Sequence, residues 1–424
     1  MQLPQPDRAK APAVVNTAPV AWIVVIAITL AQATEAFTVQ GFPALAPFVA
    51  EEFAISKARL GMLTSSFFAG GFISVIPAGW AIDRIGVRRS LAIGLGLMAV
   101  TVALGALTHS FWMLYACLLL AGIGFGSVYP ATTKAVMHWA PPRLRGTMMG
   151  IKQTGVPAGG ALAAVTLPVL ALSLGWRGAL LIAAAACAVC LVACHVLYRT
   201  HPDEIHAAVR GGRPGPHADG RAPLRAALRN RDIWLVNISG LFFLATQSTM
   251  IAWLISYLRS ELAMPVVAAG TVLAAMQIGG AAGRLGWGTV SDLVFGGRRV
   301  PIIALLGVGT GAVLWILSFL TQAGYGTLVV VSLLAGLCGI GWVGMVTVLR
   351  AELAPREGVG IVTSLGSFMG YAGSLLGPPL FGLLLDRTGD YRLAWRLLGL
   401  CAVLAGLLVL RARERTQPGA NPIA

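Results

Sequence analysis

The sequence carries GWAIDRIGVRR at residues 79–89 and GTVSDLVFGGRR at residues 288–299, half a chain apart. Each stretch follows a long apolar segment and places an aspartate, Asp83 or Asp292, between a glycine and a pair of arginines. Proline–arginine and tryptophan–arginine pairs recur in the same register, at 142–143 and 355–356 and at 176–177 and 395–396. We interpret this pattern as a duplication of two similar halves.

The composition excludes a soluble protein. Hydrophobic residues make up 57% of the 424 residues and charged residues only 11%, whereas soluble chains carry about 25% charged residues. All six cysteines lie inside apolar runs, where cysteine acts as a small hydrophobic residue. We therefore expect no disulfide, no metal site and no cofactor.

Twelve apolar segments are long enough to cross a membrane, at about 20 residues each. They lie near residues 20–48, 59–82, 90–108, 111–138, 146–172, 177–198, 232–258, 266–290, 300–321, 326–349, 358–384 and 393–411. We expect the first to be an uncleaved span, because its apolar character continues too far for a signal peptide. The fold class predicted is an all-α membrane protein, with twelve transmembrane helices in two six-helix bundles around a central cavity.

The domain boundaries follow from one long polar segment near the middle of the chain. We expect an N-terminal bundle at residues 1–198, a cytoplasmic linker at 199–231 and a C-terminal bundle at 232–424.

The net charge of +15 does not indicate nucleic acid, because the basic residues lie in short connections between apolar segments. Connections on the side of both termini hold roughly three times as many Lys and Arg as those on the other side. The positive-inside rule therefore places both termini in the cytoplasm and the chain in the cytoplasmic (inner) membrane.

The repeated loops are predicted to form a gate between the two halves. An aspartate at a helix end can accept hydrogen bonds from arginines and from a helix N-terminus, forming a latch that one conformation makes and another breaks. The alternative is a plain basic loop with an incidental aspartate. The candidate gating residues are Gly79, Asp83, Arg84, Gly86, Arg88, Arg89, Gly288, Asp292, Arg298 and Arg299.

The first loop resembles the G-x-L-a-D-r-x-G-r-[RK] signature of the major facilitator superfamily, departing from it at Ala81 and Val87. The second copy is one residue longer and has no arginine after its aspartate. Residues 130–142, with Pro130, Lys134 and Trp139, are similar to the organic-anion transporters of that superfamily. The resemblance covers nearly the whole chain, and it implies a secondary transporter rather than an enzyme.

Glu35 is the one carboxylate deep inside a predicted span, with Gln32 and Thr38 one turn to either side. Placing a charged side chain at mid-membrane costs about 2.5–3.5 kcal/mol or more, so each such residue requires a structural or functional explanation. One hypothesis is that Glu35 couples transport to protons. The other is a neutral glutamate that bonds to a neighbouring helix.

Three cations also lie within predicted spans. The run 283–292, with Arg284, resembles monocarboxylate and oxalate:formate-type carriers, which implies that Arg284 binds a substrate carboxylate through its bidentate fork. Its alternative role is to support the gate. Lys152 and Lys134 either line the cavity or extend to the membrane surface. We expect Lys152 and Arg284 to face one cavity from the two halves.

Further candidates for substrate binding are polar or aromatic residues in the spans. The stripe of Trp253 and Tyr257 is an aromatic pattern that more often packs against neighbouring helices or lies at the membrane interface than lines a pocket. The full set of further candidates is Gln153, Gln277, Tyr129, Gln247, Trp253, Tyr257 and Tyr371.

The function predicted is transport of a small organic anion, a carboxylate, by proton symport or anion exchange. The alternative is a proton-driven exporter of hydrophobic or cationic compounds, with Glu35 attracting the cargo, because residues 155–160 are partly similar to the antiporter motif of drug exporters. The expected partners are the anionic substrate, the lipid bilayer and protons, without nucleic acid. We expect a monomer.

Overall fold

The computed structural model describes residues 18–201, 225, 227–354 and 359–414. Within these ranges the chain forms α-helices and one 3-10 turn, Pro142–Leu144, and no strand. The first half contains α1 (Ala18–Val39), α2 (Phe42–Phe53), α3 (Lys57–Leu107), α4 (Phe111–Trp139) and α5 (Arg145–Leu197). The second half contains α8 (Arg231–Leu262), α9 (Val266–Val294), α10 (Val300–Phe319), α11 (Tyr325–Gly339), α12 (Val343–Leu353), α13 (Val359–Thr388) and α14 (Tyr391–Val409).

Ten helical segments of the described chain are long and apolar enough to cross a membrane. Two of them, α3 with 51 residues and α5 with 53, are far longer than the roughly 20 residues that one crossing needs. Each is interrupted at a glycine with positive φ, Gly86 at 79° and Gly175 at 73°. Glycine adopts this conformation without strain because it has no side chain, so the chain can turn back at these two positions. Each long segment therefore contains two crossings, and the prediction of twelve spans is confirmed.

Polar side chains cap the N-termini of several helices, at the ends of the apolar segments. The side chain of Asn230 accepts a hydrogen bond from Asp232 N at 2.9 Å at the start of α8. Asp390 accepts one from Arg392 N at 2.7 Å at the start of α14. These side chains satisfy backbone N–H groups that the first helical turn leaves without partners.

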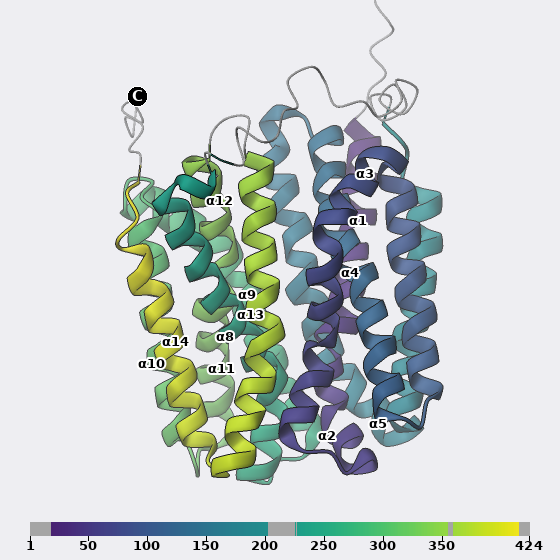
Figure 1. Cartoon of the computed structure of the whole chain (residues 1–424), viewed down its shortest axis with the longest axis vertical. Helices are drawn as coiled ribbons and strands as arrows, with labels where there is room; N and C mark the ends of the chain where they lie inside the picture. The colour runs from purple at the N-terminus through teal and green to yellow at the C-terminus, as the bar shows by residue number, and fades with distance from the viewer. Residues whose placement is uncertain (1–17, 202–224, 226, 355–358, 415–424) are drawn as a thin grey trace, which may run out of the picture.

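The two halves lie side by side, with the first half at the right of Figure 1 and the second at the left. In this view α1 begins and α14 ends at the upper end of the molecule, so an even number of crossings separates them. We call this upper end, to which the loops of Asp83 and Asp292 belong, the motif end. The lower end, where α2 lies, is called the opposite end. The domain boundaries 1–198, 199–231 and 232–424 stay a prediction, because residues 202–224 and 226 of the linker lie outside the described residues.

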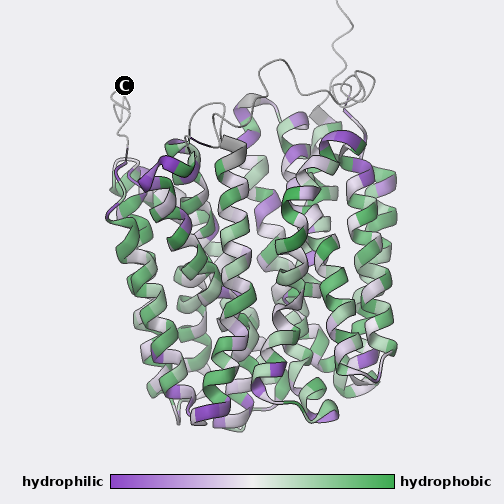
Figure 2. Ribbon diagram, in the orientation of Figure 1, coloured by the Kyte–Doolittle hydropathy of each residue, from purple (hydrophilic) through white to green (hydrophobic). Residues whose placement is uncertain are grey.

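The outer surface is apolar over much of its height, with hydrophilic residues concentrated toward the two ends (Figure 2). Large hydrophobic side chains stand free on this surface; Ile76 is 61% exposed, Val192 58% and Phe319 64%. A lipid bilayer stabilises such a surface, which would be costly in water. The expected membrane location is consistent with this surface.

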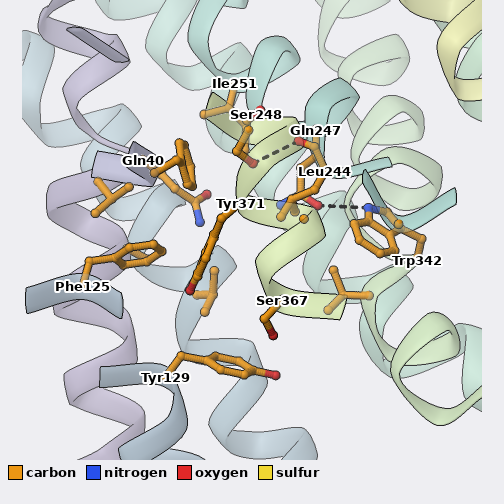
Figure 3. A pocket seen from close by; sticks show the side chains of 18 of the residues that line it. Gln40, Phe125, Tyr129, Leu244, Gln247, Ser248, Ile251, Trp342, Ser367 and Tyr371 are labelled. Atoms are coloured by element: carbon orange, nitrogen blue, oxygen red, sulfur yellow. Dashed lines mark hydrogen bonds between the residues drawn. The ribbon is translucent and has the colours of Figure 1, made fainter. Parts of the chain in front are cut away.

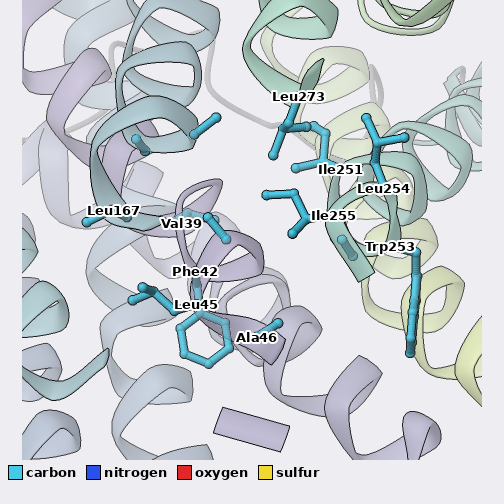
Figure 4. Packing of buried hydrophobic residues seen from close by; sticks show 14 of the residues in the cluster. Val39, Phe42, Leu45, Ala46, Leu167, Ile251, Trp253, Leu254, Ile255 and Leu273 are labelled. Carbon is cyan, nitrogen blue, oxygen red and sulfur yellow. The ribbon is translucent and has the colours of Figure 1, made fainter. Parts of the chain in front are cut away.

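The buried apolar residues join the two halves unevenly. One cluster spans both halves, and Figure 4 shows Phe42 and Leu45 of α2 near Ile251 and Ile255 of α8. The other two clusters each belong to a single half: one contains Ile28 and Leu91, the other Ile303 and Val346. The halves therefore share a core toward the opposite end and keep separate cores toward the motif end.

Candidate functional site

A cavity of about 170 Å³ lies between the two halves. Residues of α1, α3, α4 and α5 line it from the first half, and residues of α8, α9, α12 and α13 from the second. Figure 3 shows Tyr371 and Ser367 of α13 projecting into this space, between Phe125 and Tyr129 on one side and Gln247 on the other. The space could hold on the order of ten water molecules, or a small organic solute.

Arg284 lines the cavity from α9, and its polar partners are backbone carbonyls. Its Nη1 donates to the carbonyl of Gln153 across the halves at 3.2 Å, and its Nε donates to the carbonyl of Ile340 at 3.5 Å. Among the described residues no carboxylate forms an ion pair with this guanidinium. A guanidinium held by neutral oxygens retains its attraction for an anion.

Lys152 lies one layer behind the cavity wall rather than in it. It is fully buried, its Nζ donates to Thr133 Oγ1 at 2.8 Å, and the same Nζ lies 4.0 Å from the centroid of the Tyr129 ring. Tyr129 itself lines the cavity, and its hydroxyl accepts a hydrogen bond from Gln153 Nε2 at 3.1 Å. Arg284 thus faces the cavity as expected, whereas Lys152 acts on it through Tyr129.

Glu35 lines the same cavity from α1, at only 3% exposure. Its Oε2 accepts a hydrogen bond from Gln32 Nε2 at 2.9 Å, which is the one-turn polar neighbour expected from the sequence. Among the described residues Glu35 and Lys152 form no ion pair with each other. They are the acidic and the basic group that the first half places at or directly behind the cavity wall, so their formal charges cancel.

Arg350, on α12, is the functional candidate that sequence reasoning missed. It lines the cavity at 8% exposure, one residue beyond the predicted span 326–349. Its guanidinium fits between Gly240 of α8 and Gly366 of α13, where a Cβ at either position would collide with it. Its Nε has no hydrogen-bond partner among the described residues.

An extension of the internal repeat would have found Arg350. The stretch GIGF at residues 122–125 recurs as GIGW at residues 339–342. Continuing this alignment places Arg350 at the level of Thr133, next to Lys134 and inside the span. The signal was missed because a basic residue at the end of an apolar segment is usually a membrane-surface anchor.

Of three amide side chains near the cavity, two line it and the third bonds across the two halves. Gln247 lines the cavity and accepts a hydrogen bond from Trp342 Nε1 at 3.0 Å. Gln277 does not line it; instead Gln277 Nε2 donates to Gln40 Oε1 of the first half at 2.6 Å. Gln277 therefore ties the halves together, while Gln40 and Gln247 face the cavity.

Trp253, Tyr257 and Lys134 are placed elsewhere. Trp253 Nε1 donates to the carbonyl of Pro378 at 3.0 Å, and the Tyr257 hydroxyl donates to the carbonyl of Leu317 at 3.2 Å, both inside the apolar cluster shared by the halves. Trp253 and Tyr257 therefore pack in the apolar core, as in the packing alternative, and do not line the cavity. Lys134 Nζ forms an ion pair with Asp83 Oδ1 at 2.6 Å, so it belongs to the motif end and not to the cavity lining.

Among the described residues, the ion pairs of each repeated loop lie within its own half. Asp83 pairs with Lys134, and Arg299 Nη1 lies 2.6 Å from Asp292 Oδ1. Arg84 lies over the Trp80 ring at 4.7 Å, and Arg88 donates to the carbonyl of His195 at 2.5 Å.

The remaining candidates of these loops have fewer contacts. Arg89 and Arg298 are exposed. Gly86 provides the turn of the first loop, at φ 79°. Gly79 has open space at the Cβ position, and Gly288 has only Met345 at 3.7 Å, so neither glycine makes a close helix contact in this conformation.

Asp386 forms a polar link between the halves at the opposite end. Its two carboxylate oxygens accept hydrogen bonds from Lys57 N and Ala58 N, each at 2.8 Å, at the start of α3. A helix N-terminus favours a negative charge there. Together with the shared core, Asp386 closes the opposite end, whereas the ion pairs described at the motif end leave the halves unlinked.

These features define a polytopic membrane carrier with a polar cavity between two helical halves. The model of the Major Facilitator Superfamily matches residues 28–322 and 238–424, and the chain belongs to this superfamily of transporters.

Its relatives and structural neighbours agree with this family. The chain is 24% identical over 379 residues to the hexuronate transporter of Bacillus subtilis, covering 86% of this chain and 88% of that protein. It is 27% identical over 380 residues to the probable L-galactonate transporter of Escherichia coli, covering 85% and 82%. The fold is similar to a bacterial homolog of the human lysosomal transporter Spinster in an inward-facing and occupied conformation, with a TM-score of 0.75, 17% identity and coverage of 95% and 99%.

Proposed function

We propose that this chain carries a small organic acid across the cytoplasmic membrane by alternating access, with the substrate carboxylate held by Arg284. The observation that carries the proposal is the position of Arg284 in the cavity wall, with backbone carbonyls as its partners. A carboxylate is one of the anions that the guanidinium fork can bind through two parallel hydrogen bonds. Arg284 donates a hydrogen bond to the carbonyl of Gln153 in the other half, so an acid bound to Arg284 would lie where the two halves meet.

The charge around the cavity favours an anion over a cation. Lys152, Arg284 and Arg350 contribute three basic groups at or directly behind the wall, against the single carboxylate of Glu35. A cationic cargo would meet an excess of positive charge in a desolvated space, which is costly. This balance argues against the exporter of cationic compounds that the sequence left open.

The relatives support a polar organic acid. Hexuronate and L-galactonate, after which two of the relatives are named, are sugar acids with one carboxylate and several hydroxyls. Amide and hydroxyl groups of Gln247, Ser248 and Ser367 line the cavity here and could bond to such hydroxyls.

The direction in which the cavity opens follows from the closure at the opposite end. The positive-inside bias makes the motif end cytoplasmic, with both termini on that side. The closed opposite end then corresponds to an inward-facing carrier. Alternating access requires Asp386 to release the start of α3 while the loops of Asp83 and Asp292 engage the other half. The carrier would work as a monomer, since the cavity lies within one chain.

The coupling ion is proposed from Glu35. A carboxylate that shares the cavity with the substrate can exchange a proton in one conformation and pair with Lys152 in another. Proton symport and anion exchange both use this arrangement, and they differ in whether the empty carrier returns.

The test is uptake of labelled galacturonate and gluconate into vesicles that contain the purified chain. Arg284→Ala is expected to abolish uptake, and Lys152→Ala to reduce it strongly, because Lys152 supports Tyr129 from behind the cavity wall. Arg387→Ala, an exposed residue at the end of α13, is the matched control and should retain uptake. Full uptake by both cavity variants would contradict the proposal.

A further inference from the structure

Two arginines in the cavity wall lack an acidic partner. Glu35 in the cavity wall and Lys152 directly behind it carry formal charges that cancel. Arg284 bonds to carbonyls, and Arg350 has an Nε without a partner and, among the described residues, no ion pair. The cavity therefore contains two formal positive charges that the described residues do not neutralise.

The second of these arginines occupies a built site. Arg350 is buried, with only 8% of its surface exposed. Gly240 and Gly366 leave the space its guanidinium needs, because any side chain at either position would overlap it. A buried guanidinium that is cradled by glycines and lines the cavity can reach a solute there, whereas membrane-surface anchoring would direct it away from the cavity.

The two arginines surround the same region of the cavity. Arg284 projects from α9 and Arg350 from α12. Both arginines line the cavity that Tyr129 also lines. One small solute resting against Tyr129 could therefore contact both.

From this charge balance we infer that the preferred substrate carries two acidic groups, one held by Arg284 and the other by Arg350. This inference rests on the proposed function and adds a second binding residue and a narrower substrate class to it. During transport both ends close and bulk water is excluded, so a buried cation without a counterion is most costly in that state. A dianion neutralises both arginines there, whereas a monoanion leaves one unpaired.

The test uses two matched pairs of acids, which differ in one acidic group and little else. Succinate is compared with succinamate, and glucarate with gluconate, by calorimetry on the purified full-length chain. The wild-type chain is expected to bind each dianion at least about tenfold more tightly than its partner, since hydrogen bonds to charged groups are worth that much. Equal affinity within both pairs would overturn this inference and leave the proposed function standing.

The variants separate the two arginines. Arg350→Gln should lower the affinity for the dianions to that of the monoanions and change the monoanion affinity little. Arg284→Gln should abolish binding of all four acids. Arg350→Gln that keeps the dianion preference would also overturn the inference. If the wild-type chain binds none of the four acids, the proposed function fails together with it.

Gly366→Ala provides a second route should Arg350→Gln not fold. It retains the charge of Arg350 but displaces the guanidinium from its cradle. The dianion preference is expected to fall several-fold in this variant. Gly286→Ala, at an exposed glycine of α9 with open space at its Cβ position, is the matched control and should keep the preference.

Discussion

At the scale of single residues, Glu35 shows how a buried carboxylate is maintained at the cavity. It lines the cavity at 3% exposure and accepts a hydrogen bond from Gln32 at 2.9 Å. This hydrogen bond reduces the cost of burying the carboxyl group and leaves the group in contact with the cavity. The proposed coupling role requires Glu35 to gain or lose a proton as the cavity changes shape.

Glu35→Gln is expected to separate proton coupling from substrate binding. The amide retains the hydrogen-bonding shape but cannot exchange a proton, so accumulation driven by a pH gradient should fall to background. Exchange of labelled for unlabelled acid should largely remain, because Arg284 is untouched. Both activities are measured in the same vesicles. Full gradient-driven accumulation by the variant would show that protons pass elsewhere.

At the scale of helices, the two longest elements depend on glycines that no other residue replaces without strain. Gly86 divides α3 at φ 79° and ψ 167°, and Gly175 divides α5 at φ 73° and ψ 164°. This region of backbone conformation is essentially restricted to glycine. The turn between the second and third spans is thus determined by one residue of the repeated loop.

Gly86→Ala should lower the stability by about 1–3 kcal/mol, the cost of forcing a side chain into this conformation. Thermal unfolding in detergent measures the effect. Gly286→Ala in α9 is the control, since its Cβ meets open space and its φ is not positive; that change should be neutral or slightly stabilising. An unchanged melting temperature for Gly86→Ala would contradict the assigned turn.

A second feature at this scale is the pair of hydrogen bonds that joins α13 to the start of α3 at the opposite end. Asp386 accepts two backbone N–H bonds at 2.8 Å from the other half, whereas Asp390 caps α14 within its own half. The first bond pair must break when the opposite end opens, and the second need not.

Asp386→Asn is therefore expected to shift the chain toward the state open at the opposite end. Loss of charge-assisted hydrogen bonds worth about 1.5–3 kcal/mol would change this equilibrium roughly tenfold or more. Spin labels at Glu51 and Thr388, exposed and on different halves, should report longer distances. Asp390→Asn is the control and should leave the distances unchanged. Unaltered distances in Asp386→Asn would exclude this latch.

At the scale of the whole molecule, the two halves share an apolar core toward one end only. Movement of one half against the other can break polar links at the cavity and at the ends while each separate core stays intact. The cavity charge adds a second property. An empty cavity holds two guanidiniums that the described residues leave without a carboxylate partner, so its closure is more costly than closure around an acid.

Uptake should accordingly be faster into vesicles preloaded with unlabelled acid than into empty ones. Return of the carrier with a bound acid avoids closing the charged cavity without a counterion. The measurement is the initial rate of galacturonate uptake with and without internal galacturonate, with an internal neutral sugar as the control. Equal initial rates would show that return of the empty carrier is not limiting.

The membrane class, the twelve spans and the superfamily were all accessible from the sequence. Apolar segments of about 20 residues report directly on the bilayer, since each span must satisfy its own backbone groups. The repeated aspartate loops then identified the family, which the match over residues 28–322 and 238–424 confirms. These properties depend on local composition and motif spacing, so no knowledge of packing was needed.

The composition of the cavity depended on tertiary structure. Helical position does not say which neighbour a side chain meets: Lys134 pairs with Asp83, Lys152 lies behind Tyr129, and Arg350, outside the predicted span, enters the cavity. Sequence determined which few charges enter the membrane, because hydrocarbon makes them rare. Only the packing of two halves decided which charges face one another and which face a solute, because that depends on helix rotation and on glycines that leave space for a guanidinium.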